Sequence, residues 1–279
     1  MILVEYFIVY VYDYMSDIML SIVCTTYNHE KYIRETLDGF VIQKTSFPFE
    51  IIVHDDASSD RTPNIVKEYE EKYPLLFRNI YRKENWYSQG KNIWEYLFVN
   101  VVKGKYIAIC EGDDYWIDPL KLEKQVSFLE HHTEYSICYH RVKLLAGKRF
   151  ELSKIPRKYS TTQYDIARTN YINTPSVIFR NFGNEIDYTL LSQCLASDYV
   201  LWLLLSSRGK IYFLDDVMAC YRINPNSLWG TKSAIYQYSN WINTIKKLIP
   251  KYNYRVSIIL CWQLVICECI LICKRLGIR

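Results

Sequence analysis

The sequence lacks the patterns that define several common classes of protein. Its nine cysteines are scattered and odd in number, so they do not form the disulfide framework of a small secreted domain, and a reducing, cytosolic compartment is the simpler interpretation. It has no internal repeat and no low-complexity segment. The apolar first 20 residues have no basic start and no small-residue cleavage site, and they contain three acids. They therefore resemble neither a signal peptide nor a membrane span.

What remains is the composition of a folded globular protein, with an uneven charge. The 279 residues are 50% hydrophobic and 23% charged, enough to bury a full-sized core. Residues 240–279 contain seven Lys or Arg and a single acid, which leaves residues 1–239 with a net charge of −2 out of a total of +4. A basic tail on an acidic body argues against a nucleic-acid surface and favours a local anionic partner such as a membrane face.

The tail contains an apolar run, residues 256–273, that allows three arrangements. As a helix it would be roughly 27 Å long, which is marginal for a bilayer, and Glu268 in the run would be costly in lipid. Flanking Lys and Arg favour an interfacial helix, so that residues 246–279 would make a peripheral membrane contact. A spanning helix, and a helix packed on the domain or on a second copy in a homo-oligomer, remain alternatives.

Upstream of the tail, short β-branched runs alternate with segments of helical periodicity. The pattern predicts strands at residues 21–26, 50–54, 77–81 and 106–110, and helices at residues 30–43, 60–73 and 89–102. This alternation predicts an α/β fold with a mostly parallel sheet covered by helices on both faces. We expect an N-terminal extension at 1–18, one domain at 19–239 and a helical extension at 240–279.

Polar clusters follow three of the predicted strands. They are residues 25–28 (Thr-Thr-Tyr-Asn), residues 54–56 (His-Asp-Asp) and residues 111–114 (Glu-Gly-Asp-Asp). Ligands of open α/β sheets bind beyond the carboxyl ends of the strands, so these clusters predict one shared site.

The carboxylates of Glu111, Asp113 and Asp114 are costly to place together unless a cation neutralises them. Such a set of oxygen ligands suits Mg²⁺ or Mn²⁺ together with the phosphates that these ions bring. The alternative is an acidic turn that caps a helix near Pro119. Asp55 and Asp56 allow a second role, because a carboxylate there can accept hydrogen bonds from a nucleoside base or ribose.

These stretches resemble the inverting glycosyltransferases of family 2, which have the GT-A fold with a Rossmann-like sheet. Residues 21–28 are similar to the family's strand ending in P-T-Y-N, residues 53–60 to V-D-D-G-S-T-D, and residues 111–116 to the D-x-D-D-x-W metal motif. The resemblance covers roughly residues 19–225. It implies a metal-dependent (Mn²⁺ or Mg²⁺) transferase that moves a sugar from a nucleotide-diphosphate donor, commonly a UDP-sugar, with inversion.

The resemblance also implies roles for the clustered residues. Those implied to hold the nucleoside are Thr25, Tyr27 and Asp56, with Asp55 beside them. Asp113 would bind the metal near the diphosphate, with Glu111 and Asp114 next to it. The sequence departs from the family in three places, with Thr25 for Pro, Ala57 for Gly and Glu111 for Asp, and none of these removes a necessary group.

In the second half of the chain, the resemblance implies a catalytic base and an arginine that contacts the diphosphate. Ser197-Asp198, before an apolar helix, matches the place of the base, so Asp198 would deprotonate the acceptor hydroxyl. An N-cap is the alternative role for Asp198, and its weaker rivals as base are Asp187, Asp215 and Asp216. Arg222, in a Tyr-Arg pair after a later strand, would steady the charge of the diphosphate.

The expected activity is transfer to a hydroxyl of a glycan or lipid-linked acceptor in cell-surface polysaccharide synthesis, in the cytoplasm at the inner face of the plasma membrane. A nucleotidyltransferase is one alternative. It would need a Gly-rich basic loop such as G-x-G-T-R after the first strand, where residues 27–30 read Tyr-Asn-His-Glu. A non-catalytic nucleotide-sugar-binding scaffold is the other, and the intact carboxylates argue against a decayed site.

Overall fold

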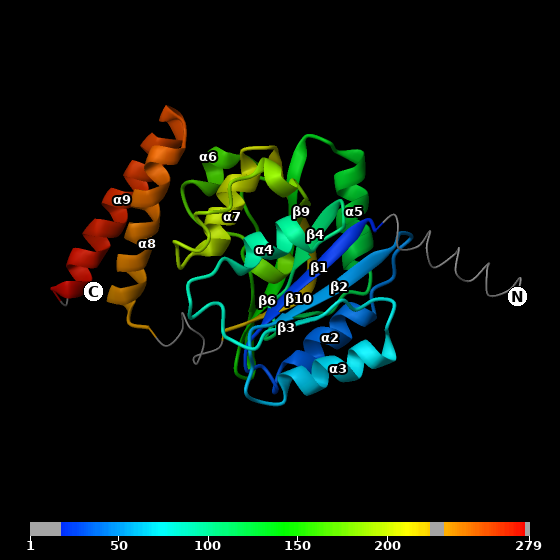
Figure 1. The fold of residues 1–279 in the computed structure, drawn as a ribbon. Coiled ribbons are helices and arrows are strands. Elements are labelled where there is room, and N and C mark those ends of the chain that lie inside the picture. The colour runs from blue at the N-terminus through cyan, green and yellow to red at the C-terminus, as the bar shows by residue number, and fades with distance from the viewer. Residues whose placement is uncertain (1–17, 224–231, 277–279) are drawn as a thin grey trace, which may run out of the picture.

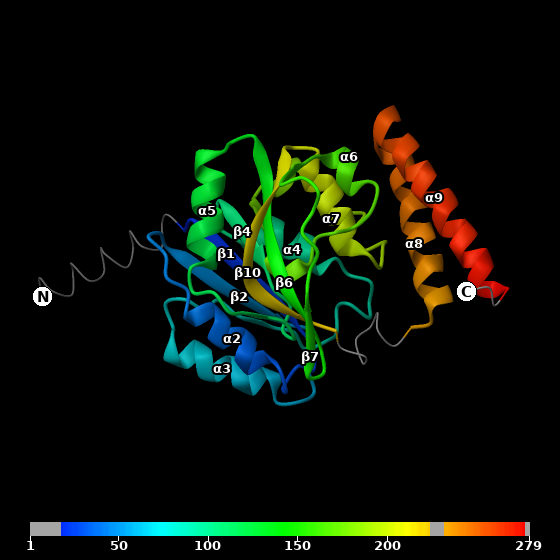
Figure 2. The ribbon, with the colours of Figure 1, turned by 180° about the vertical axis from the view of Figure 1, so that it is seen from behind.

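The structure is a computed structural model that describes residues 18–223 and 232–276. All but the last residue of the N-terminal extension expected at 1–18 lies outside the described residues. The remainder forms a ten-stranded sheet in which helices cover both faces (Figures 1 and 2). The predicted α/β class with a helical extension at its C-terminal end is confirmed.

The first half of the chain gives the parallel part of the sheet, in the order β3-β2-β1-β4. These strands are β1 (Leu20–Thr26), β2 (Phe49–Asp55), β3 (Ile80–Tyr81) and β4 (Tyr106–Ile109), and the helices between them are α2 (Ile33–Val41), α3 (Thr62–Lys72) and α4 (Ile93–Asn100). Every strand and helix predicted in this half forms, most of them within one to four residues of the expected ends.

The core has two sides because side chains alternate along each strand. Ile22 of β1 packs in the cluster that contains α2, α3 and α5 (Lys121–His131). Val23, the next residue, packs in the cluster that contains α4 and α7 (Ser197–Ser206). Both side chains are fully buried, and this double burial explains why β1 is a continuous apolar run rather than an alternating one.

The second half of the sheet is mixed. β9 (Ile178–Arg180) runs antiparallel between β4 and β6 (Tyr135–Ala146), and β6 pairs in parallel with β10 (Lys210–Arg222). Short strands and helices that the periodicity did not predict complete this half: β5 (Tyr115–Trp116), β7 (Arg149–Leu152), β8 (Ser160–Thr161), α6 (Gln163–Ile166) and the 3₁₀ turns η1 (Thr174–Ser176) and η2 (Gly183–Glu185).

The C-terminal extension is a helical hairpin at one side of the domain, with α9 on its outer edge (Figures 1 and 2). Its helices are α8 (Ala234–Leu248) and α9 (Tyr254–Arg275), joined by the 3₁₀ turn η3 (Ile249–Lys251). The boundary expected between residues 239 and 240 falls inside α8. Among the described residues, α9 is the single helix whose length and apolar composition are sufficient to cross a membrane.

Candidate active site

The three polar clusters lie at one edge of the sheet. β1 lies between β2 and β4 in parallel register, so that Thr25 stands beside His54 and Thr26 beside Asp55. The amide of Gly112 donates to the carbonyl oxygen of Thr25 at 3.0 Å. This hydrogen bond attaches residues 111–114, the acidic turn after β4, to the end of β1. The structure therefore places the three clusters together, as the strand order predicts.

The loops after β1 and β2 are hydrogen-bonded to each other. The amide of Asn28 donates to Ser58 Oγ at 2.9 Å, and Asn28 Oδ1 accepts the amide of Ser59 at 2.8 Å. Asn28 has a φ of 55° and Ala57 a φ of 63°, in the left-handed region. Asn tolerates this conformation, whereas Ala carries a steric cost that Gly would not. The backbone here thus keeps the shape that a glycine at 57 would adopt without strain.

Asp56 holds the loop of residues 82–92, a contact that no sequence pattern predicted. Its carboxylate is 4% exposed and accepts the amides of Trp86 at 2.8 Å and Tyr87 at 3.0 Å. The Asn85 side chain donates to the Asp56 carbonyl oxygen at 2.9 Å. Asp56 therefore fastens residues 82–92 beside the end of β2, whatever else it contacts.

Two tyrosines remain accessible at this edge. Tyr27 is 48% exposed and Tyr87 is 49% exposed. Burial, Tyr236 and Glu111 raise the pKa of the Tyr87 phenol, so the loop that Asp56 holds brings Tyr87 close to the acidic turn. Both rings can present a flat face to a base or sugar. Tyr87 was not predicted, because no local pattern links residues 82–92 to the strand ends.

The acidic turn depends on glycine at position 112. A Cβ there would lie 2.6 Å from Thr26 Oγ1 and 2.8 Å from His29 Nδ1, so no larger residue fits. From the other side, the Thr36 hydroxyl contacts the carbonyl oxygens of Gly112 at 3.0 Å and Asp114 at 2.6 Å. The turn is thus held between β1 and α2, which fixes where its carboxylates point.

Three acidic side chains are crowded on this turn. Burial, Asp113 and Asp198 raise the pKa of Glu111 to about 8. Burial and Asp113 raise the pKa of Asp114 well above its usual range. These carboxyls lack a counter-charge sufficient to keep them ionised at their ordinary pKa values.

The turn suits a hard divalent cation that also binds phosphate. In the described part of the chain, no three Asp, Glu, His or Cys side chains converge as a ready-made metal site. Mg²⁺ and similar ions are commonly held by one or two carboxylates plus substrate phosphates, so a complete protein cage is not needed. Of the three predicted ligands, Asp114 is 1% exposed, and its Oδ1 accepts the Arg222 amide at 2.7 Å. Asp114 Oδ2 has no partner among the described residues, while Glu111 and Asp113 are the more accessible pair.

Arg222 locks the turn to the end of β10. Its guanidinium donates to the Asp113 carbonyl oxygen, forms an ion pair with Glu35 and lies 4.4 Å from the centre of the Tyr115 ring. The side chain is 12% exposed. In this arrangement the guanidinium positions Asp113, and it would have to leave Glu35 to reach a ligand.

Asp198 comes into this site from the far half of the chain. It lies in the first turn of α7, where the N-cap is Ala196, so the alternative role as N-cap is wrong. Its Oδ2 accepts the Asn170 amide group at 2.9 Å. Burial raises the pKa of Asp198, and its negative charge contributes to the raised pKa of Glu111. A partly buried carboxylate with a raised pKa, close to the acidic turn, is a candidate general base.

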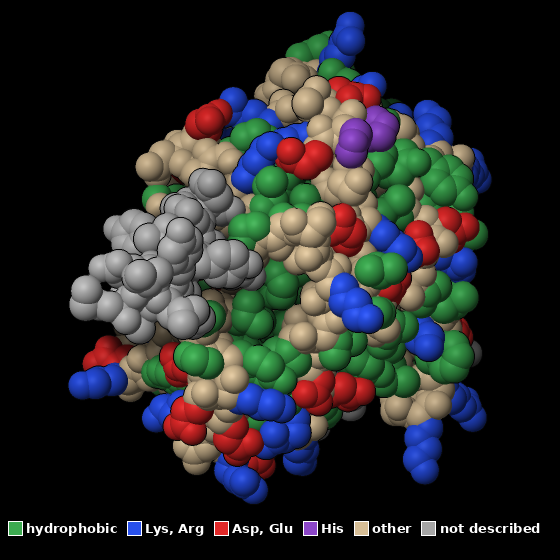
Figure 3. Space-filling model, turned by 90° about the vertical axis from the view of Figure 1, so that its right-hand side faces the viewer, with side chains coloured by type: hydrophobic (Ala, Val, Ile, Leu, Met, Phe, Trp, Pro, Cys, Tyr) green, Lys and Arg blue, Asp and Glu red, His purple; other side chains and the backbone are tan. Residues whose placement is uncertain are grey.

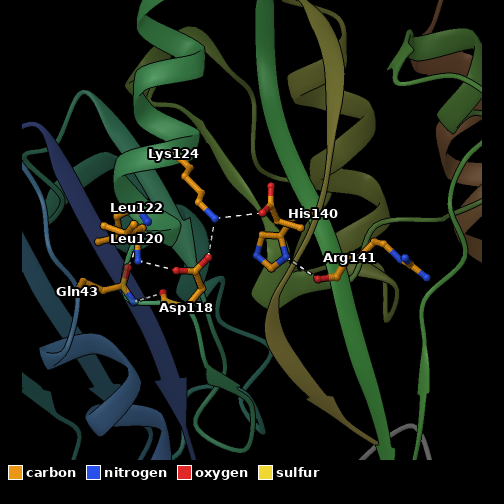
Figure 4. Close-up of polar contacts among 8 residues, drawn as sticks. Gln43, Asp118, Leu120, Leu122, Lys124, His140 and Arg141 are labelled. Atoms are coloured by element: carbon orange, nitrogen blue, oxygen red, sulfur yellow. Dashed lines mark hydrogen bonds and ion pairs between the residues drawn. The ribbon is translucent and has the colours of Figure 1, made fainter.

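The three rival carboxylates have other partners. Asp216 pairs with Lys124 at 3.1 Å, which joins α5 to β10. The same ammonium group pairs with Asp118 at 2.8 Å (Figure 4). Asp215 pairs with Arg141 at 3.3 Å. Asp187 accepts from the amide and hydroxyl of Thr189. These contacts are structural, which leaves Asp198 as the candidate base.

Comparisons of sequence agree with this geometry. The family described as Glycosyl transferase family 2 matches residues 21–188. An uncharacterized protein of Mycobacterium tuberculosis is 39% identical over 216 residues, which cover 75% of this chain and 60% of that protein. The chain thus spans about three fifths of the length of that relative. The Escherichia coli UDP-Glc:alpha-D-GlcNAc-diphosphoundecaprenol beta-1,3-glucosyltransferase WfaP is 25% identical over 242 residues, 85% of this chain and 90% of that enzyme.

Solved structures show the same fold. Staphylococcus aureus TarS (residues 1–349), in complex with UDP, has a TM-score of 0.61 at 21% identity and covers 88% of this chain and 70% of its own. The Pyrobaculum calidifontis mannosyltransferase PcManGT, in complex with GDP-Man and Mn²⁺, has a TM-score of 0.59 at 17% identity and covers 94% and 80%. At these identities the likeness establishes the GT-A fold alone.

Proposed function

This chain belongs to glycosyltransferase family 2, and on that premise we propose that it transfers a sugar from a UDP-sugar to an acceptor hydroxyl with inversion. The observation that carries the proposal is that Asp198 lies near enough to the acidic turn for its charge to raise the pKa of Glu111. The charges of Asp113 and Asp198 both act on Glu111, although Asp198 lies in the far half of the chain. A donor-side acid pair and an acceptor-side base thus share one site.

The donor's nucleoside would lie over the ends of β1 and β2. The accessible ring of Tyr27 offers a stacking face, with Thr25 beside it. Asp55 is 2% exposed, and its Oδ1 has no hydrogen-bond partner among the described residues. Asp56 contributes in two ways, since it holds the loop that carries Tyr87 and a carboxylate retains lone pairs for a nucleoside.

The donor's diphosphate would lie at the acidic turn with a divalent cation, Mn²⁺ or Mg²⁺. Asp113 and Glu111 would hold the ion, with Asp114 behind them bonded to the Arg222 amide. When bound, the ion offsets the negative charge of the leaving nucleoside diphosphate. Arg222 fixes the Asp113 backbone and, released from Glu35, would add a cation to the same charge.

Asp198 would accept the proton of the attacking hydroxyl. Burial raises the pKa of Asp198 toward neutral pH, and a general base is most effective when its pKa lies near the working pH. Asn170 orients it by donating to Oδ2. Attack from the Asp198 side, opposite the leaving diphosphate at the acidic turn, inverts the anomeric carbon.

The acceptor class follows from the named relative. WfaP is a glucosyltransferase whose name describes a lipid-diphosphate-linked sugar acceptor, so we propose a glycan or lipid-linked acceptor in cell-surface polysaccharide synthesis. All nine cysteines lie in the described residues and are free, which suits a reducing compartment at the cytoplasmic face of the membrane.

The direct test combines calorimetry with a donor-hydrolysis assay. The protein should bind UDP more tightly with Mn²⁺ than without it, and it should hydrolyse or transfer from a UDP-sugar. Asp113→Asn should abolish both the metal dependence and the turnover, whereas Asp187→Asn, which alters a carboxylate bonded to Thr189, should change neither. Full turnover in Asp113→Asn would contradict the metal assignment. Tighter binding of GDP than UDP would contradict the choice of donor.

A non-catalytic scaffold makes the opposite prediction in one respect. It would bind UDP without turnover, and Asp198→Asn would then have no effect on any measured activity. The retention of Glu111, Asp113 and Asp198 in one site disfavours this alternative.

A further inference from the structure

Helix α9 has an inner face that packs on the protein. Its buried residues recur every three or four positions and are Val256, Leu260, Gln263, Cys267 and Leu271. Gln263 accepts a hydrogen bond from the Tyr199 hydroxyl of α7 at 3.2 Å. Further contacts join α9 to α8 and α6. The inner face therefore fixes the orientation of α9 on the domain.

The outer face of α9 is also apolar, although none of the residues that the structure describes covers it. Its exposed side chains between the helix ends are Ile258, Cys261, Trp262, Val265, Ile266, Cys269, Ile272 and Cys273. Trp262 is 68% exposed. On the opposite side of the molecule, charges of both signs are interspersed with apolar side chains, as on an ordinary solvated surface (Figure 3). A helix that is apolar all round is normally covered on every side, so this face is a candidate docking surface.

Charge identifies the kind of partner. The one acid of α9, Glu268, pairs with Lys246 of α8 at 2.8 Å and is thereby neutralised. Exposed cations stand at both ends of the apolar face, and they are Lys251 and Arg255 at one end and Lys274 and Arg275 at the other. Within the described residues, none of these four forms an ion pair. An apolar strip with basic ends is the pattern of a helix that lies in the interface of an anionic bilayer.

A second copy of the chain fits this face less well. In a two-fold symmetric pair, the same patch meets itself. Whether two α9 helices met parallel or antiparallel, their basic ends would then face basic ends. A spanning helix also fits poorly, because the inner face, with the Gln263–Tyr199 hydrogen bond, would have to leave the domain.

We propose that the outer face of α9 docks on the surface of an anionic lipid bilayer, with Trp262 in the interface and the four terminal cations at the headgroups. The start of α8 and the end of α9 lie toward the side of the domain where strands β1 and β2 end (Figure 1). Docking would therefore hold the candidate active site beside the membrane. The inference does not depend on the proposed glycosyl transfer, and its test uses no donor.

The test is sedimentation of the full chain with vesicles. Vesicles of phosphatidylcholine with phosphatidylglycerol should bind the protein, and vesicles of phosphatidylcholine alone should bind it at least about tenfold more weakly. Trp262→Asp should weaken binding about tenfold or more. Lys274→Gln with Arg275→Gln should weaken it about 30-fold, since each cation near the surface contributes about 1 kcal/mol, or roughly fivefold.

Matched controls lie on the β6–β7 hairpin. Phe150 is 60% exposed, so Phe150→Asp is the control for replacing an exposed aromatic residue with an acid. Lys148 and Arg149 are both exposed, so Lys148→Gln with Arg149→Gln is the control for removing two positive charges. Both should bind vesicles like the unaltered protein, with circular dichroism confirming the fold of every variant. Equal binding to neutral and anionic vesicles would overturn the proposal. A protein that does not bind vesicles and forms a dimer in light scattering, dissociated by Trp262→Asp, would also overturn it. So would membrane-bound protein that resists alkaline carbonate extraction, because such resistance indicates a spanning helix.

Discussion

Substituting Asp56 with asparagine separates two roles for this residue. As a loop anchor, Asp56 accepts the amides of Trp86 and Tyr87 while buried at 4% exposure. As a nucleoside contact alone, it would matter only when a donor is bound. Asn keeps the size of the side chain but turns an amide donor toward one of the two backbone N–H groups. The anchoring role therefore predicts an effect without any ligand.

The magnitude follows from the two hydrogen bonds. A hydrogen bond to a charged group contributes about 1.5–3 kcal/mol, and the Asn variant loses one such bond and weakens the other. Opening of the loop should become easier by about 2–3 kcal/mol, so amide exchange at Trp86 and Tyr87 should accelerate roughly 30- to 150-fold. Hydrogen exchange of the peptide covering residues 82–92, measured without nucleotide, reads this directly.

The matched control is Glu84→Gln, which removes a negative charge from the same loop. The Glu84 carboxylate contacts the Gln89 side chain rather than the backbone, so exchange at Trp86 and Tyr87 should not change. The affinity for UDP should fall in Asp56→Asn and should be unchanged in Glu84→Gln. If exchange in the loop is unaltered in Asp56→Asn while UDP binding is lost, the anchoring argument is refuted and the residue serves the ligand alone.

Three further predictions follow from the same site. Asp198→Asn, which preserves the contact with Asn170, should lower kcat by about 10²–10⁴-fold while leaving UDP affinity unchanged, as steady-state kinetics and calorimetry would show. The folded-state pKa of Glu111 is raised to about 8, so without divalent ions its ionisation destabilises the protein progressively as pH rises from about 4.5 to 8. Glu111→Gln should therefore raise the free energy of unfolding at pH 9 by about 2 kcal/mol, after discounting for partial exposure, with the gain vanishing near pH 4; an equal gain at both pH values would exclude this cause. Ala57→Gly should stabilise the protein by about 0.5–1 kcal/mol in urea unfolding, because φ is 63° there, and an unchanged midpoint would show that the strain is relieved elsewhere.

The parts of the fold that could be predicted are those encoded in contiguous residues. A strand such as β1 is a short apolar run closed by polar residues, and parallel strands place such ends at one edge, so the position of Asp55 and Asp113 followed from order alone. The two-residue strand β5 has no period to detect. It exists because it pairs with β10, about 100 residues later in the chain.

The contacts that shape the site, like the pairing of β5, join residues that are far apart in the sequence and could not be predicted from it. The partners of Asp56 lie 30 and 31 positions away, and the partner of Asp114 lies 108 positions away. No local periodicity encodes such pairs, because tertiary packing creates them. The resemblance to a family identified the carboxylates, yet it gave them ligand-facing roles only, and the structure adds that Asp56 and Asp114 also hold the protein together.

This double use has a consequence for how the two halves of the chain cooperate. The acidic turn is bonded to β1 through Thr25, to α2 through Thr36 and to β10 through Arg222. Arg222 grips the Asp113 backbone while its own side chain is pinned by Glu35, so a shift of the β10 end would move the carboxylates that we assign to the cation.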